Sequence, residues 1–136
     1  MTLSTPVVGQ DFQKGYDAYW AGDFATALQE WAPLAEAGGA EAQNNLAFMY
    51  RKGEGVPQDY AESVKWYRLA AEQGVAKAQT NLGYMYEYGR GVPQDYAEAV
   101  KWYRLAADQG VAKAQTNLGY MYEYGRGVPQ DYAEAV

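Results

Sequence analysis

The sequence contains no cysteine and no histidine. The absence of cysteine excludes a disulfide framework, a thiol nucleophile and zinc held by thiolates. The absence of histidine removes the commonest general base and the commonest metal ligand. Serine occurs only at Ser4 and Ser63, and neither lies in a G-x-S-x-G setting. We therefore expect no catalytic residue, no metal and no cofactor, because catalysis would have to rest on carboxylates, Lys, Arg, Tyr or Thr.

Basic runs and long apolar runs are also missing. The chain has 17 acidic and 11 basic residues, a net charge of −6, and the two signs are interleaved. This balance favours solubility and argues against binding to a phosphate backbone. No apolar stretch approaches the roughly 20 residues that a membrane span needs. We expect neither nucleic-acid binding nor membrane insertion.

The first ten residues, MTLSTPVVGQ, have no basic segment and no long apolar core. They are either a short N-terminal tail or the remnant of a signal peptide, since Val7 and Gly9 are small enough to precede a cleavage site. A signal peptide upstream would make the protein periplasmic or secreted. Otherwise the protein is expected in the cytoplasm.

What the sequence does contain is a repeat. Residues 73–100 and 109–136 are identical over 28 positions, and residues 40–64 are a diverged copy. A period of 36 residues is typical of a solenoid, in which each unit buries its apolar face only against its neighbours. Solenoids usually present binding surfaces, so this period favours a binding function.

The sequence of each repeat predicts two helices. Residues 76–88 place Ala78, Leu82, Met85 and Tyr86 on one face, and Gly89 suits the left-handed position that ends a helix. A turn follows at residues 90–93.

Asp95 begins the second helix in a D-x-x-E arrangement with Glu98, which resembles a capping box. The apolar face of this helix is predicted at Tyr96, Val100, Tyr103 and Ala107. Small residues, Gly83 among them, should let the helices approach closely while aromatic rings, including Trp66 and Trp102, fill the gaps.

The N-terminal helix pair differs from the later repeats, because residues 11–21 and 23–37 are predicted to form two helices joined directly at Gly22. We interpret residues 11–38 as a tetratricopeptide-like capping pair and residues 39–136 as the repeats, with the last repeat truncated. Pro33 should kink its helix or end it early. The uncapped C-terminal end is expected to allow self-association.

The 36-residue unit, with L-G-x-M-Y, G-x-G-V-P-Q-D and W-Y-R-L-A-A, resembles the Sel-1-like repeat, a relative of the tetratricopeptide repeat, over Gly38 to Val136. The resemblance implies an all-α, right-handed α/α superhelical solenoid whose first helices line a concave groove. It also implies an adaptor that holds other proteins, in a family with many exported bacterial members. A cysteine-rich branch is linked to β-lactams, and this sequence departs from that branch because it has no cysteine.

The face opposite the apolar stripe of each first helix, which is expected to line the concave side of the solenoid, is our candidate partner-binding surface. It comprises Asn45, Phe48, Lys77, Asn81, Tyr84, Tyr88, Lys113, Asn117, Tyr120 and Tyr124. Amide side chains can hydrogen-bond an extended peptide backbone, and tyrosine supplies a large contact area. The alternative is that this face is merely solvated, or that its rings pack between repeats.

Other candidate functional sites have less support in the sequence. The loop Gly89-Arg90-Gly91 lacks the Lys-Ser/Thr of a phosphate-binding loop and is interpreted as a turn. Glu87 with Glu123, or Asp95 with Asp131, would be the carboxylates of a hydrolase, but each is expected to cap a helix or to lie on a solvated rim. The predicted function is a non-enzymatic protein-interaction scaffold. The alternatives are a cell-envelope hydrolase that uses carboxylates, or a structural fragment of a longer repeat protein.

Overall fold

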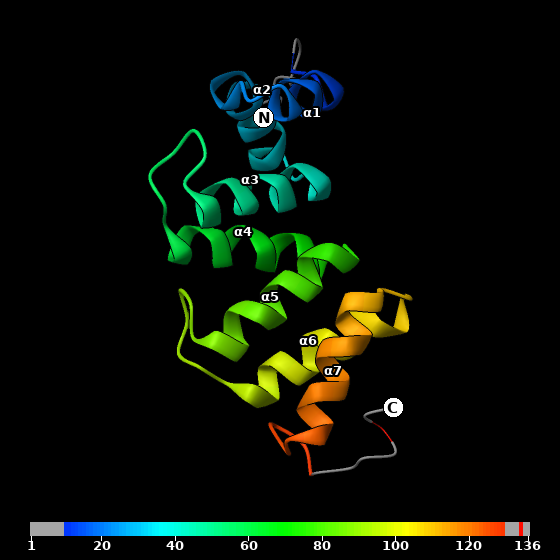
Figure 1. The fold of residues 1–136 in the computed structure, drawn as a ribbon. Coiled ribbons are helices and arrows are strands. Elements are labelled where there is room, and N and C mark those ends of the chain that lie inside the picture. The colour runs from blue at the N-terminus through cyan, green and yellow to red at the C-terminus, as the bar shows by residue number, and fades with distance from the viewer. Residues whose placement is uncertain (1–9, 130–133, 135–136) are drawn as a thin grey trace, which may run out of the picture. The chain divides into compact units, whose positions relative to one another are not determined.

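The computed structural model describes residues 10–129 and residue 134, and this part of the chain folds into seven α-helices without a strand (Figure 1). The helices are α1 (Phe12–Trp20), α2 (Phe24–Glu36), α3 (Ala40–Lys52), α4 (Tyr60–Glu72), α5 (Ala76–Tyr88), α6 (Tyr96–Asp108) and α7 (Ala112–Glu123). They form two compact units, Met1–Ala70 and Ala71–Val136, which are described separately. The described residues thus contain the predicted helix pairs up to α6 and the first helix of the last repeat, whose second helix lies outside the described residues.

An aspartate precedes each of the helices α1, α2, α4 and α6 and caps its N-terminus. The carboxylate of Asp95 accepts a hydrogen bond from the backbone N–H of Glu98 at 3.1 Å, as the capping pattern predicts. Asp59 accepts the equivalent bond in α4, at 3.1 Å. Each cap satisfies an N–H group that the first helical turn leaves without a partner.

The G-x-G-V-P-Q-D segment is a turn that folds back on the helix before it. Gly89 ends α5 in the left-handed conformation, with φ 63°. Gln94 then donates from Nε2 to the carbonyl of Glu87 at 2.8 Å, and Gln58 makes the same bond to Arg51 at 2.7 Å. The loop thus satisfies carbonyls that the last helical turn leaves free, which supports its interpretation as a structural element.

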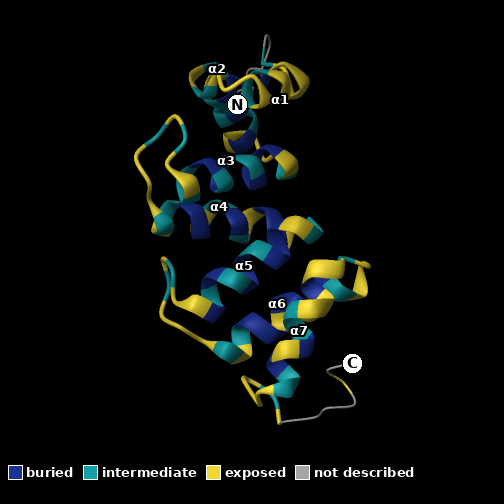
Figure 2. Ribbon diagram, viewed as in Figure 1, coloured by how far each residue is buried: buried dark blue, intermediate teal, exposed yellow. Residues whose placement is uncertain are grey.

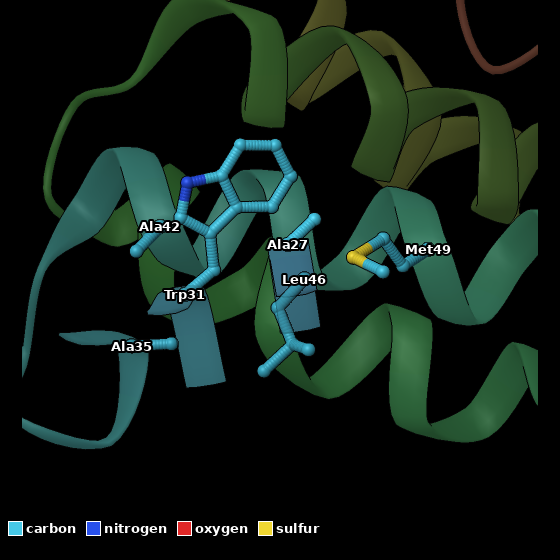
Figure 3. Packing of buried hydrophobic residues seen from close by; sticks show 6 residues of the cluster. All are labelled: Ala27, Trp31, Ala35, Ala42, Leu46 and Met49. Atoms are coloured by element: carbon cyan, nitrogen blue, oxygen red, sulfur yellow. The ribbon is translucent and has the colours of Figure 1, made fainter. Parts of the chain in front are cut away.

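The first unit packs around Trp31, which is 2% exposed. Figure 3 shows its indole with the five other buried side chains of this cluster, Ala27, Ala35, Ala42, Leu46 and Met49. The indole Nε1 donates to the carbonyl of Phe12 at 3.0 Å. A Cβ atom on Gly15 would lie 2.5 Å from that nitrogen, so only glycine lets α1 pack this closely on α2.

Pro33 does not end α2 early. The helix continues to Glu36, and the carbonyl of Pro33 accepts a hydrogen bond from Ala37 at 3.0 Å. A proline removes its own N–H donor but keeps its carbonyl as an acceptor. Proline therefore remains compatible with the last turn of this packed helix.

In the second unit, α6 packs on both α5 and α7. The buried cluster between α6 and α7 consists of Ala99, Val100, Tyr103 and Met121. Gly83 of α5 faces the ring of Tyr103, since a Cβ atom there would lie 2.7 Å from it. This confirms the prediction that small residues bring the helices close while aromatic rings fill the space between them.

The buried surface of α5 is wider than the predicted stripe (Figure 2). Ala78, Leu82 and Met85 are buried as predicted, but so are Gln79 and three further residues, Thr80, Gly83 and Glu87. Gln79 donates from Nε2 to the carbonyl of Ala71 at 3.2 Å. A buried amide with a backbone partner costs little, so an apolar wheel alone could not identify this second buried face.

Candidate functional site

The candidate face of α5, opposite its predicted apolar stripe, carries the residues Lys77, Asn81, Tyr84 and Tyr88. Lys77 is exposed, Asn81 and Tyr84 are half-buried, and Tyr88 is 53% exposed. The rings of Tyr84 and Tyr88 lie 4.7 Å apart, and the guanidinium of Arg90 lies 5.2 Å and 5.9 Å from their centres. Positions 84 and 88 therefore share one face, as their spacing of four residues predicts.

The corresponding face of α7 carries the same residue types, but its arginine stacks on one of the two tyrosines of this face, Tyr124. Lys113 and Tyr120 are exposed, Asn117 is half-buried, and Tyr124 just after the helix is 61% exposed. The guanidinium of Arg126 lies 5.3 Å from the centre of the Tyr124 ring. The second unit thus holds two copies of a motif that combines an amide, aromatic rings and a stacked arginine.

Arg126 also connects parts of the second unit that are distant in sequence. Its guanidinium lies 5.6 Å from the ring of Tyr96, at the start of α6. The carboxylate of Glu87 and partial burial raise the pKa of Tyr88, and the positive charge of Arg126 opposes this rise. Arg126 is therefore close enough to α5 to act electrostatically on Tyr88.

In the first unit, α3 carries the corresponding residues Asn45 and Phe48, both half-buried. The ring of Phe48 lies 4.9 Å from the guanidinium of Arg51 and 5.9 Å from the ammonium of Lys52. Its edge also meets Tyr19 of α1 at 6.3 Å. Phe48 therefore packs partly within its own unit, as the packing alternative for these aromatic positions expects.

The stacked arginines Arg90 and Arg126 are functional candidates that the sequence-based site did not include. Both lie just beyond the glycine that follows the first helix, in a segment interpreted only as a turn. The left-handed glycine reverses the chain, so that the next side chain lies over the last helical turn. The signal in the sequence was an arginine one residue after this glycine in two successive repeats.

Glu87 does not lie on a solvated rim and does not cap a helix, so this expectation was wrong. Glu87 is buried, and its Oε1 accepts a hydrogen bond from the hydroxyl of Tyr103 at 2.7 Å. Burial, together with this bond, raises the pKa of Tyr103 well above its ordinary value. The pair joins α5 to α6, which gives Glu87 a structural role in the second unit.

The other carboxylates considered for hydrolysis are also accounted for in part. Asp95 caps α6, Glu123 is half-buried, and Asp131 lies outside the described residues. Among residues 10–129 and 134, no three or more Asp or Glu side chains cluster in a way that could hold a metal ion. Within the same residues, none of the helices combines the length and apolarity required to cross a bilayer.

A hollow of about 660 Å³ lies beside α7 in the second unit. Tyr120 and Glu123 line it together with Ala107, Ala112, Gln115, Thr116, Leu118, Gly119 and Glu134. Of residues 130–136, only Glu134 is described by the structure.

The Sel1 repeat model matches residues 40–75, 76–111 and 112–136. A protective antigen of uropathogenic Escherichia coli that displays an SLR fold is similar in structure, with a TM-score of 0.88 and 44% identity over 96% of this chain and 28% of that one. A Sel1 repeat protein from Oxalobacter formigenes is similar with a TM-score of 0.87 and 40% identity, over 92% of this chain and 51% of that one.

The chain thus spans about half or less of the length of these two bacterial proteins. No curated protein sequence matches it significantly. The helix pairs of the described residues and these similarities confirm the predicted fold class, an all-α solenoid of helix–turn–helix repeats. The chain belongs to the Sel1 repeat family.

Proposed function

We propose that the chain is a non-enzymatic adaptor that holds a peptide or protein partner on those faces of its first helices that lie opposite the apolar stripe, on α5 and α7 in the second unit and on α3 in the first. Sel1 repeat proteins are commonly protein-interaction scaffolds and are generally not enzymes. The partner itself is not specified by membership of the family.

One observation carries the proposal. Asn45, Asn81 and Asn117 occupy the same position in three successive repeats, and all three are half-buried. An aromatic residue, Phe48, Tyr84 or Tyr120, follows each of them by three positions. An amide on the same helix face as an aromatic residue suits an extended peptide, because the amide can both donate to and accept from its backbone.

The tyrosines contribute contact area at little cost. Tyr88, Tyr120 and Tyr124 are each more than half exposed, at 53%, 53% and 61%. A tyrosine has few rotatable bonds, so immobilising it in a complex loses less entropy than ordering a lysine or a glutamate. Large exposed rings in register along a repeat protein are therefore suited to protein binding.

The test is a selection from a library of random peptides displayed on phage, with the folded chain immobilised. We expect peptides to be enriched, and we expect Asn81→Ala with Asn117→Ala to weaken the selected peptides roughly tenfold or more, because each change removes hydrogen bonds of about 0.5–1.5 kcal/mol. Titration calorimetry measures the affinity. Mass spectrometry after incubation should find the peptide intact.

Lys101→Ala with Asp108→Ala is the matched control, because both residues are exposed and belong to α6, a second helix outside the proposed surface. This variant should bind the selected peptides as the original chain does. The proposal fails if the library yields no enriched peptide, or if the α6 variant loses affinity while the asparagine variant keeps it.

A further inference from the structure

Helix α1 of the first unit exposes three aromatic rings on one face. Phe12, Tyr16 and Trp20 follow one another at intervals of four residues, and they are 36%, 45% and 70% exposed. Residues four apart lie on the same side of a helix, so the three rings form a stripe about 12 Å long, which we call the α1 stripe. Large aromatic side chains that gather on one exposed face indicate an interaction surface.

Contacts within the first unit hold the rings of the α1 stripe in place. Tyr16 and Trp20 meet edge to face with 6.1 Å between ring centres, and Tyr19 lies nearly perpendicular to Trp20 at 5.4 Å. Phe12 lies 5.8 Å from the buried ring of Trp31. The exposed rings are therefore already ordered, and a ligand that binds to them loses little side-chain entropy.

The helix pair α1–α2 carries much of the acidity of the chain. Residues 10–37 contain five carboxylates and a single lysine, hence a net charge of −4, whereas the whole sequence has −6. The ammonium of Lys14 forms an ion pair with the buried Glu30 at 3.2 Å, so these two charges offset each other. The other four carboxylates are all exposed, and they are Asp11, Asp17, Asp23 and Glu36. The surface of this helix pair therefore attracts cationic ligands.

Asp17 is the carboxylate that α1 places beside its stripe. It precedes Trp20 by three residues, and side chains three apart are neighbours on a helix surface. Its Oδ1 accepts a hydrogen bond from the side-chain amide of Gln13 at 2.9 Å. Asp23, exposed before α2, follows Trp20 by three residues. A carboxylate accepts several hydrogen bonds, so Asp17 can also accept from a guanidinium or an ammonium group.

Other aromatic rings of this chain are covered by the chain's own cations. Arg126 lies over Tyr124 at 5.3 Å, and Lys101 lies over Trp102 at 5.2 Å. Within residues 10–129 and 134, no arginine or lysine lies over Tyr16 or Trp20. Residues 10–37 contain no arginine at all. The two most exposed rings of the α1 stripe therefore lack the cation that comparable rings of this chain have.

We infer that the α1 stripe and Asp17 bind a basic segment of a partner protein, one that contains arginine or lysine. The cationic group lies over the ring of Trp20 or Tyr16 and donates to the carboxylate of Asp17, while apolar side chains of the segment contact the ring edges. This surface is additional to the faces of α3, α5 and α7, and neither proposal depends on the other.

The charge around the α1 stripe disfavours other occupants. Exposed carboxylates repel the phosphates of a nucleic acid and of an anionic membrane. A second copy of the chain also has a net charge of −6, and like charges brought together across an interface cost affinity. Charge complementarity therefore favours a basic segment.

The test is a two-step selection from random peptides displayed on phage. The library is first depleted on Tyr16→Ser with Trp20→Ser, which removes peptides that bind elsewhere, and it is then selected on the original chain. We expect enriched peptides in which Arg and Lys are several-fold more frequent than in the starting library. Their affinity, measured by titration calorimetry, should fall as NaCl rises from roughly 0.05 M to roughly 0.5 M, because salt screens exposed charges.

Asp17→Asn should weaken these peptides roughly three- to tenfold, because it removes the charge but keeps an oxygen that can accept from Gln13. Glu36→Gln is the matched control and should retain the affinity. It removes one exposed carboxylate from the last residue of α2. Trp31 of α2 donates to the carbonyl of Phe12, so the chain beyond Trp31 leads away from the end of α1 that carries Trp20.

Nuclear magnetic resonance of the original chain locates the bound peptide. The four tryptophans give separate indole N–H signals, and Trp20→Phe assigns the signal of Trp20. A selected peptide should shift this signal and leave that of Trp102 in the second unit unchanged. Circular dichroism verifies that each variant keeps the helical content, and the resonance experiment needs no variant that removes both rings.

The inference is overturned if the depleted library enriches no peptide on the original chain, or if the enriched peptides carry no excess of Arg and Lys. Equal weakening by Asp17→Asn and Glu36→Gln also overturns it. So does a shift of the Trp20 signal when the protein is concentrated without peptide, or when vesicles of phosphatidylglycerol are added, because the occupant is then a second copy or a membrane. A selection without depletion still tests the faces of α3, α5 and α7, so the two proposals fail separately.

Discussion

At the scale of single residues, the packing of this protein depends on glycines that lie against aromatic rings. Gly15 lies against Trp31 and Gly83 lies against Tyr103, at distances that leave no room for a Cβ atom. Close packing makes such contacts sensitive to a single added group. The repeat pattern predicts small residues at these positions, and the structure identifies the ring that each glycine faces.

Replacing Gly83 by leucine should destabilise the protein by about 1–3 kcal/mol. The added side chain collides with Tyr103, which is fully buried and hydrogen-bonded to Glu87, so the ring has no easy way to move. Chemical denaturation measures the change in the free energy of unfolding. Ala97→Leu is the control, because position 97 is exposed on α6. Equal stability of the two variants would contradict the contact between α5 and α6.

The pair formed by Glu87 and Tyr103 allows a second prediction. Tyr103→Phe removes the hydroxyl that donates to the buried carboxylate at 2.7 Å. The carboxylate then loses a hydrogen bond inside the protein, which should cost about 1–3 kcal/mol of stability at neutral pH. Tyr120→Phe, at an exposed position, provides the comparison in the same denaturation experiment. A Tyr103 variant as stable as the Tyr120 variant would show that the bond contributes nothing.

At the scale of helices, the repeats provide matched positions with different surroundings. Gln79 and Gln115 have identical neighbours in sequence, and both donate to a carbonyl at the end of the preceding helix at 3.2 Å. Gln79 is buried and also accepts a hydrogen bond from Gln109 at 2.9 Å, whereas Gln115 is exposed. The same local sequence is therefore buried around Gln79 and exposed around Gln115.

Gln79→Ala should therefore lower the stability of the protein more than Gln115→Ala does. It leaves the carbonyl of the buried Ala71 without this donor, which costs about 1–3 kcal/mol. In Gln115→Ala water can replace the lost amide as a hydrogen-bond partner, so we expect this variant to lose at most about 0.5–1.5 kcal/mol of stability. Thermal or denaturant unfolding of the two variants tests this order. A larger loss for Gln115→Ala would be the contrary result.

At the scale of the whole molecule, both units bury tyrosine hydroxyls. Burial raises the pKa of Tyr19 to about 12, and a hydrogen bond to the carboxylate of Glu54 adds to the rise. Burial likewise raises the pKa of Tyr67 in the first unit and of Tyr103 in the second. Each ionised phenolate would have to leave the interior or lose its solvation there.

Stability should therefore fall in alkaline solution. A raised pKa in the folded state means that the stabilising contribution is complete below the unfolded pKa of 10.0 and is lost as the pH rises toward the folded value. For Tyr19 this window extends from 10.0 to about 12. Denaturation curves across this window should show a shallower loss for Tyr19→Phe than for the original chain. If the stability of Tyr19→Phe and that of the original chain fell equally with pH, this result would argue against a raised pKa at Tyr19.

Much of the architecture was predictable because local rules repeat along the chain. Aspartate caps, left-handed glycines and the apolar positions Ala78, Leu82 and Met85 each follow from the pattern, and the structure confirms them. The membership of the binding face remains a prediction. The burial of Glu87 was not predictable, because its partner Tyr103 lies sixteen residues away on another helix.

The sequence alone determined the period of 36 residues, the two helices in each unit and the loop that joins them, because caps, turns and helical spacing act over a few residues. Only the tertiary structure decided which of two identical segments is buried. Thr80 is buried in α5, while the identical Thr116 is exposed in α7. Burial depends on which neighbouring helices cover a residue, and this information is not contained in a local stretch of sequence.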